Sequence, residues 1–191
     1  MKSIRFKNKT YTKTKVKNNI KRILSASNDT LFYNWYEGAN EFCNVASDIY
    51  NIPQSKVIGI LAALSPLKSW DENKNLLLSF LDGDYFGHTS VFINKALDIL
   101  EGSGKDTDIL KTLKGLKISS FYLNIKYPLC AKNVTIDRHA ISIATGIKFT
   151  ENYAMTQNQY NFFKDCYIEL AKDVKLIPNE LQSITWLNYR L

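Results

Sequence analysis

Apolar residues recur at helical intervals along most of the chain beyond residue 15, and this periodicity constrains the fold more than any other feature. In residues 30–50, for example, Leu31, Trp35 and Phe42 fall on one side of a helix. Residues 53–65, PQSKVIGILAALS, are apolar nearly all round, which is typical of a central, buried helix. No stretch of five or more residues alternates between polar and apolar residues with turn signals on both sides, so the sequence predicts no sheet. We therefore expect an all-α domain of about ten helices joined by short loops.

Capping residues mark the ends of several expected helices. Asn28 and Asp29 are expected to cap the helix over 30–50, and Ser69 is expected to cap the helix over 70–81. Other helices are expected over 16–26, 89–102, 106–115, 117–127, 135–146, 156–174 and 178–190. The glycines expected at helix C-termini are Gly102, Gly115 and Gly146.

The composition excludes several classes of protein. At 191 residues the chain is long enough to bury a core as one domain. It has no apolar run long enough to span a membrane and no hydrophobic segment of a secretory signal at its N-terminus. Its cysteines, Cys43, Cys130 and Cys166, lie far apart and lack CxxC spacing, which argues against disulfides and a zinc site and suits a reducing compartment. We expect a cytoplasmic protein, in a bacterium or a phage-infected host, with no membrane contact and no bound metal.

The positive charge is concentrated at the N-terminus. Of the 25 lysines and arginines, nine lie in the first 22 residues, which contain no acidic residue. The remainder is nearly neutral, with 16 basic and 18 acidic residues. This pattern predicts a basic arm over residues 1–22 that contacts a polyanion, followed by a helical domain over 23–191. The alternative is a solvated chain end with no binding role.

The segment over residues 113–121, LKGLKISSF, ends one expected helix at Gly115 and begins another shortly afterwards. Such a tight turn leaves the first N–H groups of the second helix facing outward, where they can hold a phosphate oxygen. Lys114 and Lys117 flank the turn and attract anions over a longer range. The alternative is that Gly115 only caps the end of a helix, as glycine commonly does.

Asp137 follows Ser119 by 18 residues and lies in the segment VTIDRHA. Thr135 is the expected N-cap here, which places Asp137 in the first turn of a helix. The helix dipole favours an ionised carboxylate there by about 0.3–1 kcal/mol, and the residue can serve helix stability alone. A partly desolvated carboxylate beside a sugar can also stabilise an oxocarbenium-like centre or orient the water that attacks it.

Together these two segments resemble the helix-hairpin-helix DNA glycosylase superfamily, which includes endonuclease III and adenine DNA glycosylase. A hairpin LPGVGxxTA is followed in that superfamily by a helix that opens VDTH, and the corresponding segments here have the same separation. Residues 57–75 resemble its buried helix and DNA-facing turn, and residues 178–190 resemble its closing helix. The resemblance covers roughly residues 30–191.

The resemblance implies a single domain of two helical lobes with a cleft between them. It implies a monomer that binds double-stranded DNA, rotates a damaged or modified base out of the stack and hydrolyses the N-glycosidic bond without a cofactor, as in base excision repair. Asp137 would be the catalytic residue. The DNA-binding residues would be Lys114, Gly115, Leu116, Lys117, Ser119 and Arg138. The substrate cleft would include Lys68, Ser69, Trp70 and Tyr122.

The chain departs from the superfamily pattern at several positions. Lys117 replaces the second hairpin glycine. Ser119 stands where bifunctional members have a catalytic lysine, and a hydroxyl cannot form a Schiff base, so we expect a monofunctional enzyme. Ala63 stands where the adenine-specific enzyme has a glutamate, and the C-terminal cysteine cluster is missing.

The remaining polar and aromatic residues have structural alternatives. His88 and His139 are too far apart in sequence to predict a metal site, and His139 suits helix packing. Trp70 can stack on a base or pack in the core. Tyr122, Asn124 and Arg138 are expected near the cleft. Gln182, Trp186 and Arg190 share one helix face, which suits a packed polar stripe.

Two other functions fit the same scaffold. Glycosylase-like phage proteins are proposed to add amines to activated pyrimidines in hypermodified DNA, and a degenerate hairpin fits such an enzyme. A non-catalytic module that recognises modified or distorted DNA is the other alternative. Retention of Asp137 favours an enzyme over a module.

Overall fold

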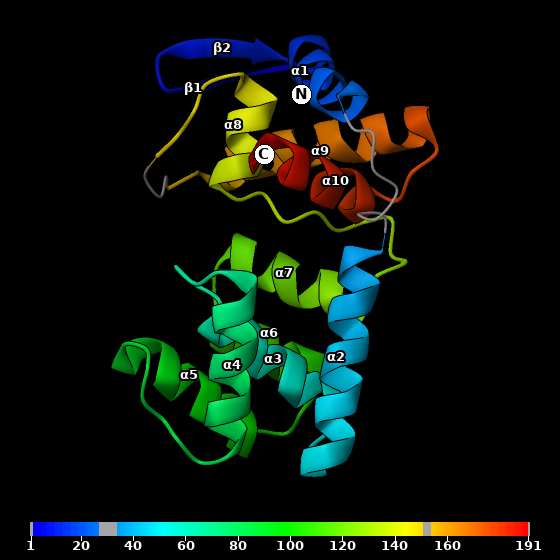
Figure 1. Cartoon of the computed structure of the whole chain (residues 1–191). Helices are drawn as coiled ribbons and strands as arrows, with labels where there is room; N and C mark the ends of the chain where they lie inside the picture. Colours follow the sequence, from blue (N-terminus) through cyan, green and yellow to red (C-terminus); the bar gives the residue numbers. More distant parts are fainter. Residues whose placement is uncertain (1, 27–33, 151–153, 191) are drawn as a thin grey trace. The chain divides into compact units, whose positions relative to one another are not determined.

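The computed structural model describes residues 2–26, 34–150 and 154–190, and at Arg190 it describes the backbone alone (Figure 1). The chain divides into two compact units. Unit 1 comprises Met1–Tyr36 and Tyr127–Leu191, and unit 2 comprises Glu37–Lys126. The expected helix caps Asn28 and Asp29 lie outside the described residues.

The described part of the chain is mainly helical, which confirms the all-α class. No helix in this part is both long and apolar enough to cross a membrane. The helices are α1 (Lys13–Ser25), α2 (Trp35–Tyr50), α3 (Gln54–Leu64), α4 (Trp70–Leu81), α5 (Ser90–Glu101), α6 (Asp106–Leu113), α7 (Leu116–Lys126), α8 (Arg138–Thr145), α9 (Gln157–Val174) and α10 (Pro178–Arg190).

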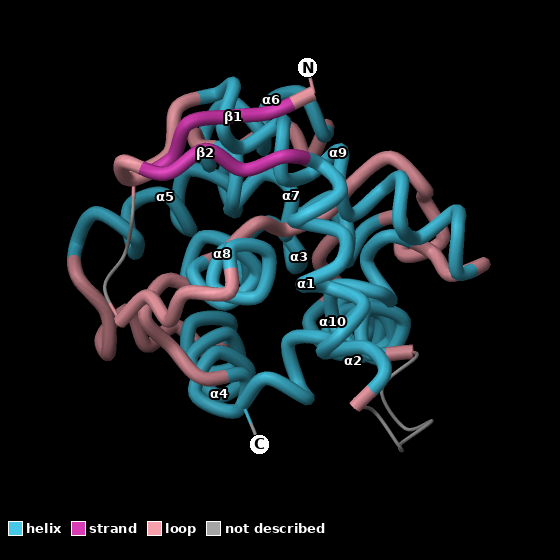
Figure 2. Tube along the Cα trace, turned by 90° about the horizontal axis from the view of Figure 1, so that it is seen from above, coloured by secondary structure: helices cyan, strands magenta, loops and turns pink. Residues whose placement is uncertain are grey.

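A small sheet precedes the first helix, so the prediction of no sheet is wrong at the N-terminus. Strands β1 (Ser3–Phe6) and β2 (Lys9–Thr12) pair antiparallel and lie side by side before α1 (Figure 2). They are joined by Lys7 and Asn8, whose φ angles of 42° and 59° give the left-handed conformation that a two-residue hairpin needs. Four-residue strands with mostly polar surface residues are too short to show a clear alternation.

The basic N-terminal segment is part of unit 1, so the prediction that it is a separate arm is wrong. Phe6, Tyr11, Val16 and Ile20 are fully or almost fully buried. Helix α1 packs against α8, α9 and α10, and β1 packs against α9. The Phe6 ring meets the ring of Phe163 edge-on, with 5.5 Å between the centroids. The apolar positions of the segment therefore fix it to the unit while its lysines and arginines remain at the surface.

Unit 2 is organised around α3, which confirms the expected central helix. Every residue from Val57 to Leu64 is buried. At Gly59 the helix passes so close to its neighbours that an added Cβ would lie 2.9 Å from Ile99 and 3.0 Å from Ile109. Helix α4 begins at the predicted cap Ser69. These contacts place the α3–α4 loop and the α6–α7 turn on a packed helical support.

Candidate nucleic-acid interface

The α6–α7 turn is a two-residue connection at the surface of unit 2. Helix α6 is capped by Lys114, one residue before the predicted Gly115, and both residues have a positive φ, 47° and 99°. A Cβ added at Gly115 would have no atom within 4 Å, so the turn is open on that side. The N–H of Ser119 donates to the carbonyl of Gly115 at 3.1 Å, which begins the hydrogen bonding of α7.

The predicted DNA-binding residues of this turn are therefore held together on one short connection. Lys114, Gly115 and Lys117 are exposed, while Leu116 and Ser119 are half-buried. The first N–H groups of a helix have no partner within it and carry the positive end of the helix dipole. Helix α7 presents this end next to two exposed lysines, an arrangement that suits a phosphate group.

Asp137 is the N-cap of α8, so the prediction that Thr135 caps this helix is wrong. Its Oδ1 accepts a hydrogen bond from the N–H of Ala140 at 2.7 Å. The carboxylate is half-buried, and no hydrogen bond or ion pair from the described residues reaches its Oδ2. Thr135 is 5% exposed in the extended segment before the helix. The capping bond fixes the direction of the carboxylate and leaves one oxygen available to another group.

Two buried tyrosines from α9 hold the backbone around Asp137. The hydroxyl of Tyr160 accepts from the N–H of Ile136 at 3.2 Å and donates to the carbonyl of Val134 at 3.1 Å. The hydroxyl of Tyr167 donates to the carbonyl of Ala140 at 3.3 Å. Burial raises the pKa of Tyr167 well above its usual value, and the nearby charge of Asp137 raises it further. Tyr167 therefore stays neutral beside the carboxylate.

The residues directly after Asp137 differ in their exposure. Arg138 is exposed, and its Nη1 donates to the carbonyl of Thr150 at 3.5 Å. His139 is half-buried, and its ring meets those of Trp186 and Tyr189 edge-on at centroid distances of 6.0 and 6.3 Å. His139 thus packs in an aromatic cluster, which agrees with the helix-packing role expected from the sequence. The described residues contain no group of three side chains placed to hold a metal ion.

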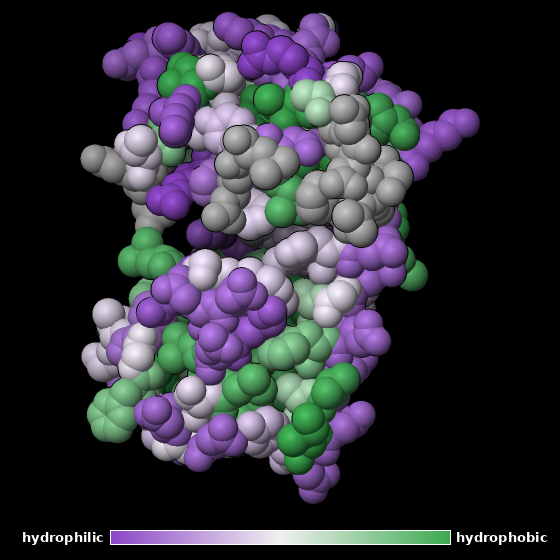
Figure 3. All heavy atoms as spheres, viewed as in Figure 1, coloured by the Kyte–Doolittle hydropathy of each residue, from purple (hydrophilic) through white to green (hydrophobic). Residues whose placement is uncertain are grey.

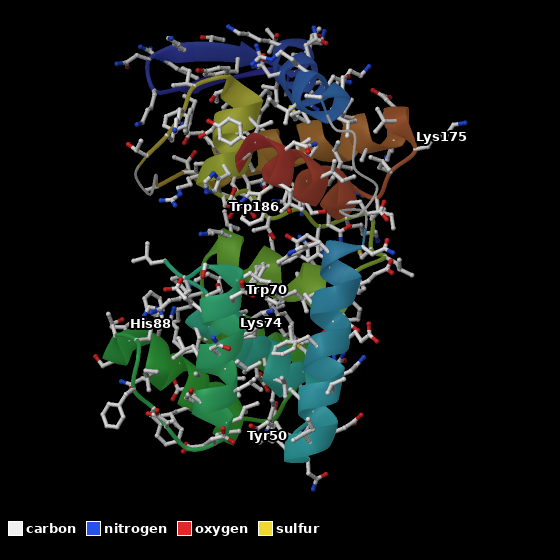
Figure 4. All side chains as sticks on the ribbon, in the orientation of Figure 1. Tyr50, Trp70, Lys74, His88, Lys175 and Trp186 are labelled. Atoms are coloured by element: carbon white, nitrogen blue, oxygen red, sulfur yellow. The ribbon has the colours of Figure 1, made fainter. Side chains whose placement is uncertain are left out.

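Two of the three residues of the predicted polar stripe on α10 can be described, and both are packed within unit 1. Gln182 is 6% exposed, and its Oε1 accepts from the hydroxyl of Tyr36 at 2.9 Å. Trp186, labelled in Figure 4, contacts His139 as described above. The side chain of Arg190 lies outside the described residues. Gln182 and Trp186 are therefore packing residues of unit 1.

The predicted cleft residues at the start of α4 belong to unit 2. Lys68 donates to the carbonyl of Gly87 at 3.1 Å, and Ser69 caps α4 in a capping box. The Trp70 ring meets that of Phe42 edge-on at 6.1 Å. The ammonium group of Lys74 lies 5.6 Å from the Trp70 ring centroid (Figure 4). These contacts favour packing over base stacking for Trp70.

Two of the predicted cleft residues are core residues instead. Tyr122 is fully buried, and its hydroxyl donates to Oδ1 of Asp106 at 2.7 Å. Asn124 is also fully buried. Both are among the buried residues of α7. The expectation that Tyr122 and Asn124 contact a nucleotide is therefore wrong.

Leu67, in the loop between α3 and α4, has an unusual backbone conformation and an exposed side chain, and the sequence does not predict either feature. It has a φ of 64°, which is exceptional for a branched side chain, and it is 76% exposed. The loop is held in place because the carbonyl of Pro66 lies 3.0 Å from Nε2 of His88. No sequence signal marks Leu67, since leucine is rare at positive φ and common in cores.

The chain belongs to a family described only as a family of unknown function (DUF7178), which matches residues 2–190. No curated protein and no solved structure matches the chain.

Proposed function

We propose that the protein is a monofunctional DNA glycosylase-like enzyme that hydrolyses the N-glycosidic bond of a damaged or modified base in duplex DNA. The observation that carries the proposal is the state of Asp137. One carboxylate oxygen is anchored at 2.7 Å to the N–H of Ala140, and the other has no partner among the described residues. Helix capping alone uses one oxygen and does not require the second. The sequence resemblance to the helix-hairpin-helix glycosylases supports the same role.

Asp137 would act at the sugar. As the bond between C1′ and the base nitrogen breaks, the electron pair leaves with the base and positive charge develops on the sugar. A fixed carboxylate stabilises this charge because its direction is set before the reaction begins. A water molecule then forms the new bond to C1′, and its proton passes to the carboxylate or to the departing base. The product is an abasic site.

The α6–α7 turn, on unit 2, would hold a backbone phosphate of DNA. Its support is the open surface at Gly115, the start of α7 and the exposed ammonium groups of Lys114 and Lys117. Ser119 lacks an amine, so no Schiff base forms and the strand stays intact after base release.

Leu67, on unit 2, would insert between stacked bases of DNA. Apolar side chains that project from a protein surface are used in this way to separate stacked bases. The positive φ of Leu67 costs conformational energy, and this cost is consistent with a functional position. The carbonyl of the neighbouring Pro66 contacts the His88 ring, and this contact holds the loop in place.

The proposal is tested with a panel of duplexes that carry deaminated, oxidised, alkylated or hydroxymethylated bases. We expect the wild-type protein to create abasic sites that alkali converts to strand breaks. Asp137→Asn should abolish them, while Asp165→Asn, which removes an exposed carboxylate elsewhere in unit 1, should not. A heavier base in nucleoside mass spectrometry would instead indicate group transfer. Binding to modified duplexes without any product would indicate a recognition module, and either result refutes hydrolysis.

A further inference from the structure

The two units carry very different charges. Unit 1 holds 16 of the 25 basic residues but only 7 of the 18 acidic residues, whereas unit 2 holds 9 basic and 11 acidic residues. The excess in unit 1 comes from the N-terminal hairpin and α1, where nine basic residues are accompanied by no acidic one. The surface that these elements form is therefore strongly positive at neutral pH.

The cations on one side of α1 are neutralised by α9. Lys13 forms an ion pair with Glu169. Lys17 lies between two carboxylates, 3.8 Å from Glu169 and 3.5 Å from Asp173. Contact with Glu169 raises the pKa of Lys13, so this side chain stays charged and bound. The inner lysines thus contribute to the attachment of α1 and not to an open binding surface.

Other exposed cations of the hairpin and α1 are not confined to one side of these elements. We define the N-terminal cationic face by the exposed residues Arg5, Lys9, Lys15, Lys21 and Arg22. In the described residues, none of these side chains forms an ion pair. Arg5 lies on the solvent-facing side of the hairpin opposite Thr10. Lys15 and Arg22 lie two turns apart on one face of α1.

The uncharged residues of this surface are also polar. Within residues 2–26 the exposed positions include no large apolar side chain. They include serine, threonine and asparagine, whose side chains donate hydrogen bonds to phosphate oxygens. Hydrophilic residues gather over the hairpin in Figure 3. A membrane-binding surface would need apolar side chains to insert between lipids, and this surface has none in the described residues.

We infer that the N-terminal cationic face binds the phosphate backbone of duplex DNA independently of base sequence. The choice of DNA among polyanions rests on the proposed function, but the site includes neither Asp137 nor any residue of the α6–α7 turn. Each phosphate that it neutralises releases condensed counterions, so its contribution must weaken as salt rises. The face would retain the protein on DNA while modified bases are sought.

The test compares two triple variants on an unmodified duplex, by fluorescence anisotropy between low and moderate salt. Arg5→Gln, Lys9→Gln and Arg22→Gln remove three cations from the N-terminal cationic face. The matched control, Lys105→Gln, Lys111→Gln and Lys175→Gln, removes the same charge from other exposed positions. We expect the first variant to bind at least tenfold more weakly and to lower the slope of log affinity against log salt by about 2–3. The control should change the slope by less than about 1.

Several results would overturn this inference. One is equal loss in both variants, since net charge alone would then explain binding. Another is unchanged binding by the first variant at an unchanged melting temperature. Tighter binding to duplex RNA or to anionic phospholipid vesicles would reassign the face. Asp137→Asn should retain the wild-type slope of log affinity against log salt. The salt dependence therefore tests this inference even if the proposed catalysis is refuted.

Discussion

Replacement of Asp137 separates its capping role from the chemical role that we propose. Asparagine is as good an N-cap as aspartate, so Asp137→Asn keeps an acceptor for the N–H of Ala140 at 2.7 Å and loses only the charge at the helix N-terminus. We expect a loss of about 0.3–1 kcal/mol in the free energy of unfolding. Asp137→Ala loses the hydrogen bond as well and should cost about 1–2 kcal/mol.

These losses are measurable as melting temperatures. For a chain of this size 1 kcal/mol corresponds to about 2–4 °C, so the Ala variant should melt roughly 2–8 °C below wild type and the Asn variant less. Circular dichroism at the helical band and the abasic-site assay are run on the same preparations. The capping and catalytic roles together predict that Asn retains the fold and loses the activity. Equal melting of both variants would refute the capping geometry. Activity retained by Asn but lost by Ala would refute the catalytic role.

Four further substitutions test the packing and the loops. Gly59→Ala should destabilise unit 2 by about 1 kcal/mol or more, because the new Cβ would lie 2.9 Å from Ile99. Gly38→Ala should stabilise α2 by about 0.5 kcal/mol, because no atom lies within 4 Å of the new Cβ. Thermal melts in which both variants shift the melting temperature in the same direction would contradict this. Burial lowers the pKa of His88 below its usual value, so protonation favours the unfolded chain, and the stability present above pH 6.5 should fall as the pH drops below it. Melts of His88→Asn across this range should show a smaller decline, and an identical decline would show that His88 is not its source. Gly146→Ala, at a φ of 71°, should cost about 1 kcal/mol in urea unfolding, and no loss would contradict the left-handed end of α8.

Helix periodicity predicts most of the fold because the buried positions decide it. Ser69 begins α4 and Gly146 ends α8 as expected, and the apolar run from Val57 is the centre of unit 2. The N-terminal hairpin escapes prediction because Phe6 and Tyr11 are its only fully buried side chains in the described residues. With only these two buried positions among many lysines, the sequence is typical of a charged tail, although the hairpin packs against α9.

The candidate site is predicted less well, because exposure depends on tertiary packing. Lys114 and Lys117 are exposed as expected, but Tyr122 is turned inward by its bond to Asp106, and sequence spacing alone does not show on which side of α7 it lies. Leu67 gives the opposite case. Its positive φ arises from the loop geometry, so no local residue pattern announces it.

The central claim is that the carboxylate of Asp137 stabilises positive charge on a nucleotide sugar. It is tested most directly by the affinity for two duplexes, one with a protonated pyrrolidine ring in place of a deoxyribose and one with the neutral tetrahydrofuran ring. At 4 Å and an effective dielectric constant of 20, opposite charges attract by about 4 kcal/mol before screening. We predict that the wild-type protein binds the charged ring at least tenfold more tightly, and that Asp137→Asn abolishes this preference. Equal affinity for both rings, or a preference that survives Asp137→Asn, would contradict the account.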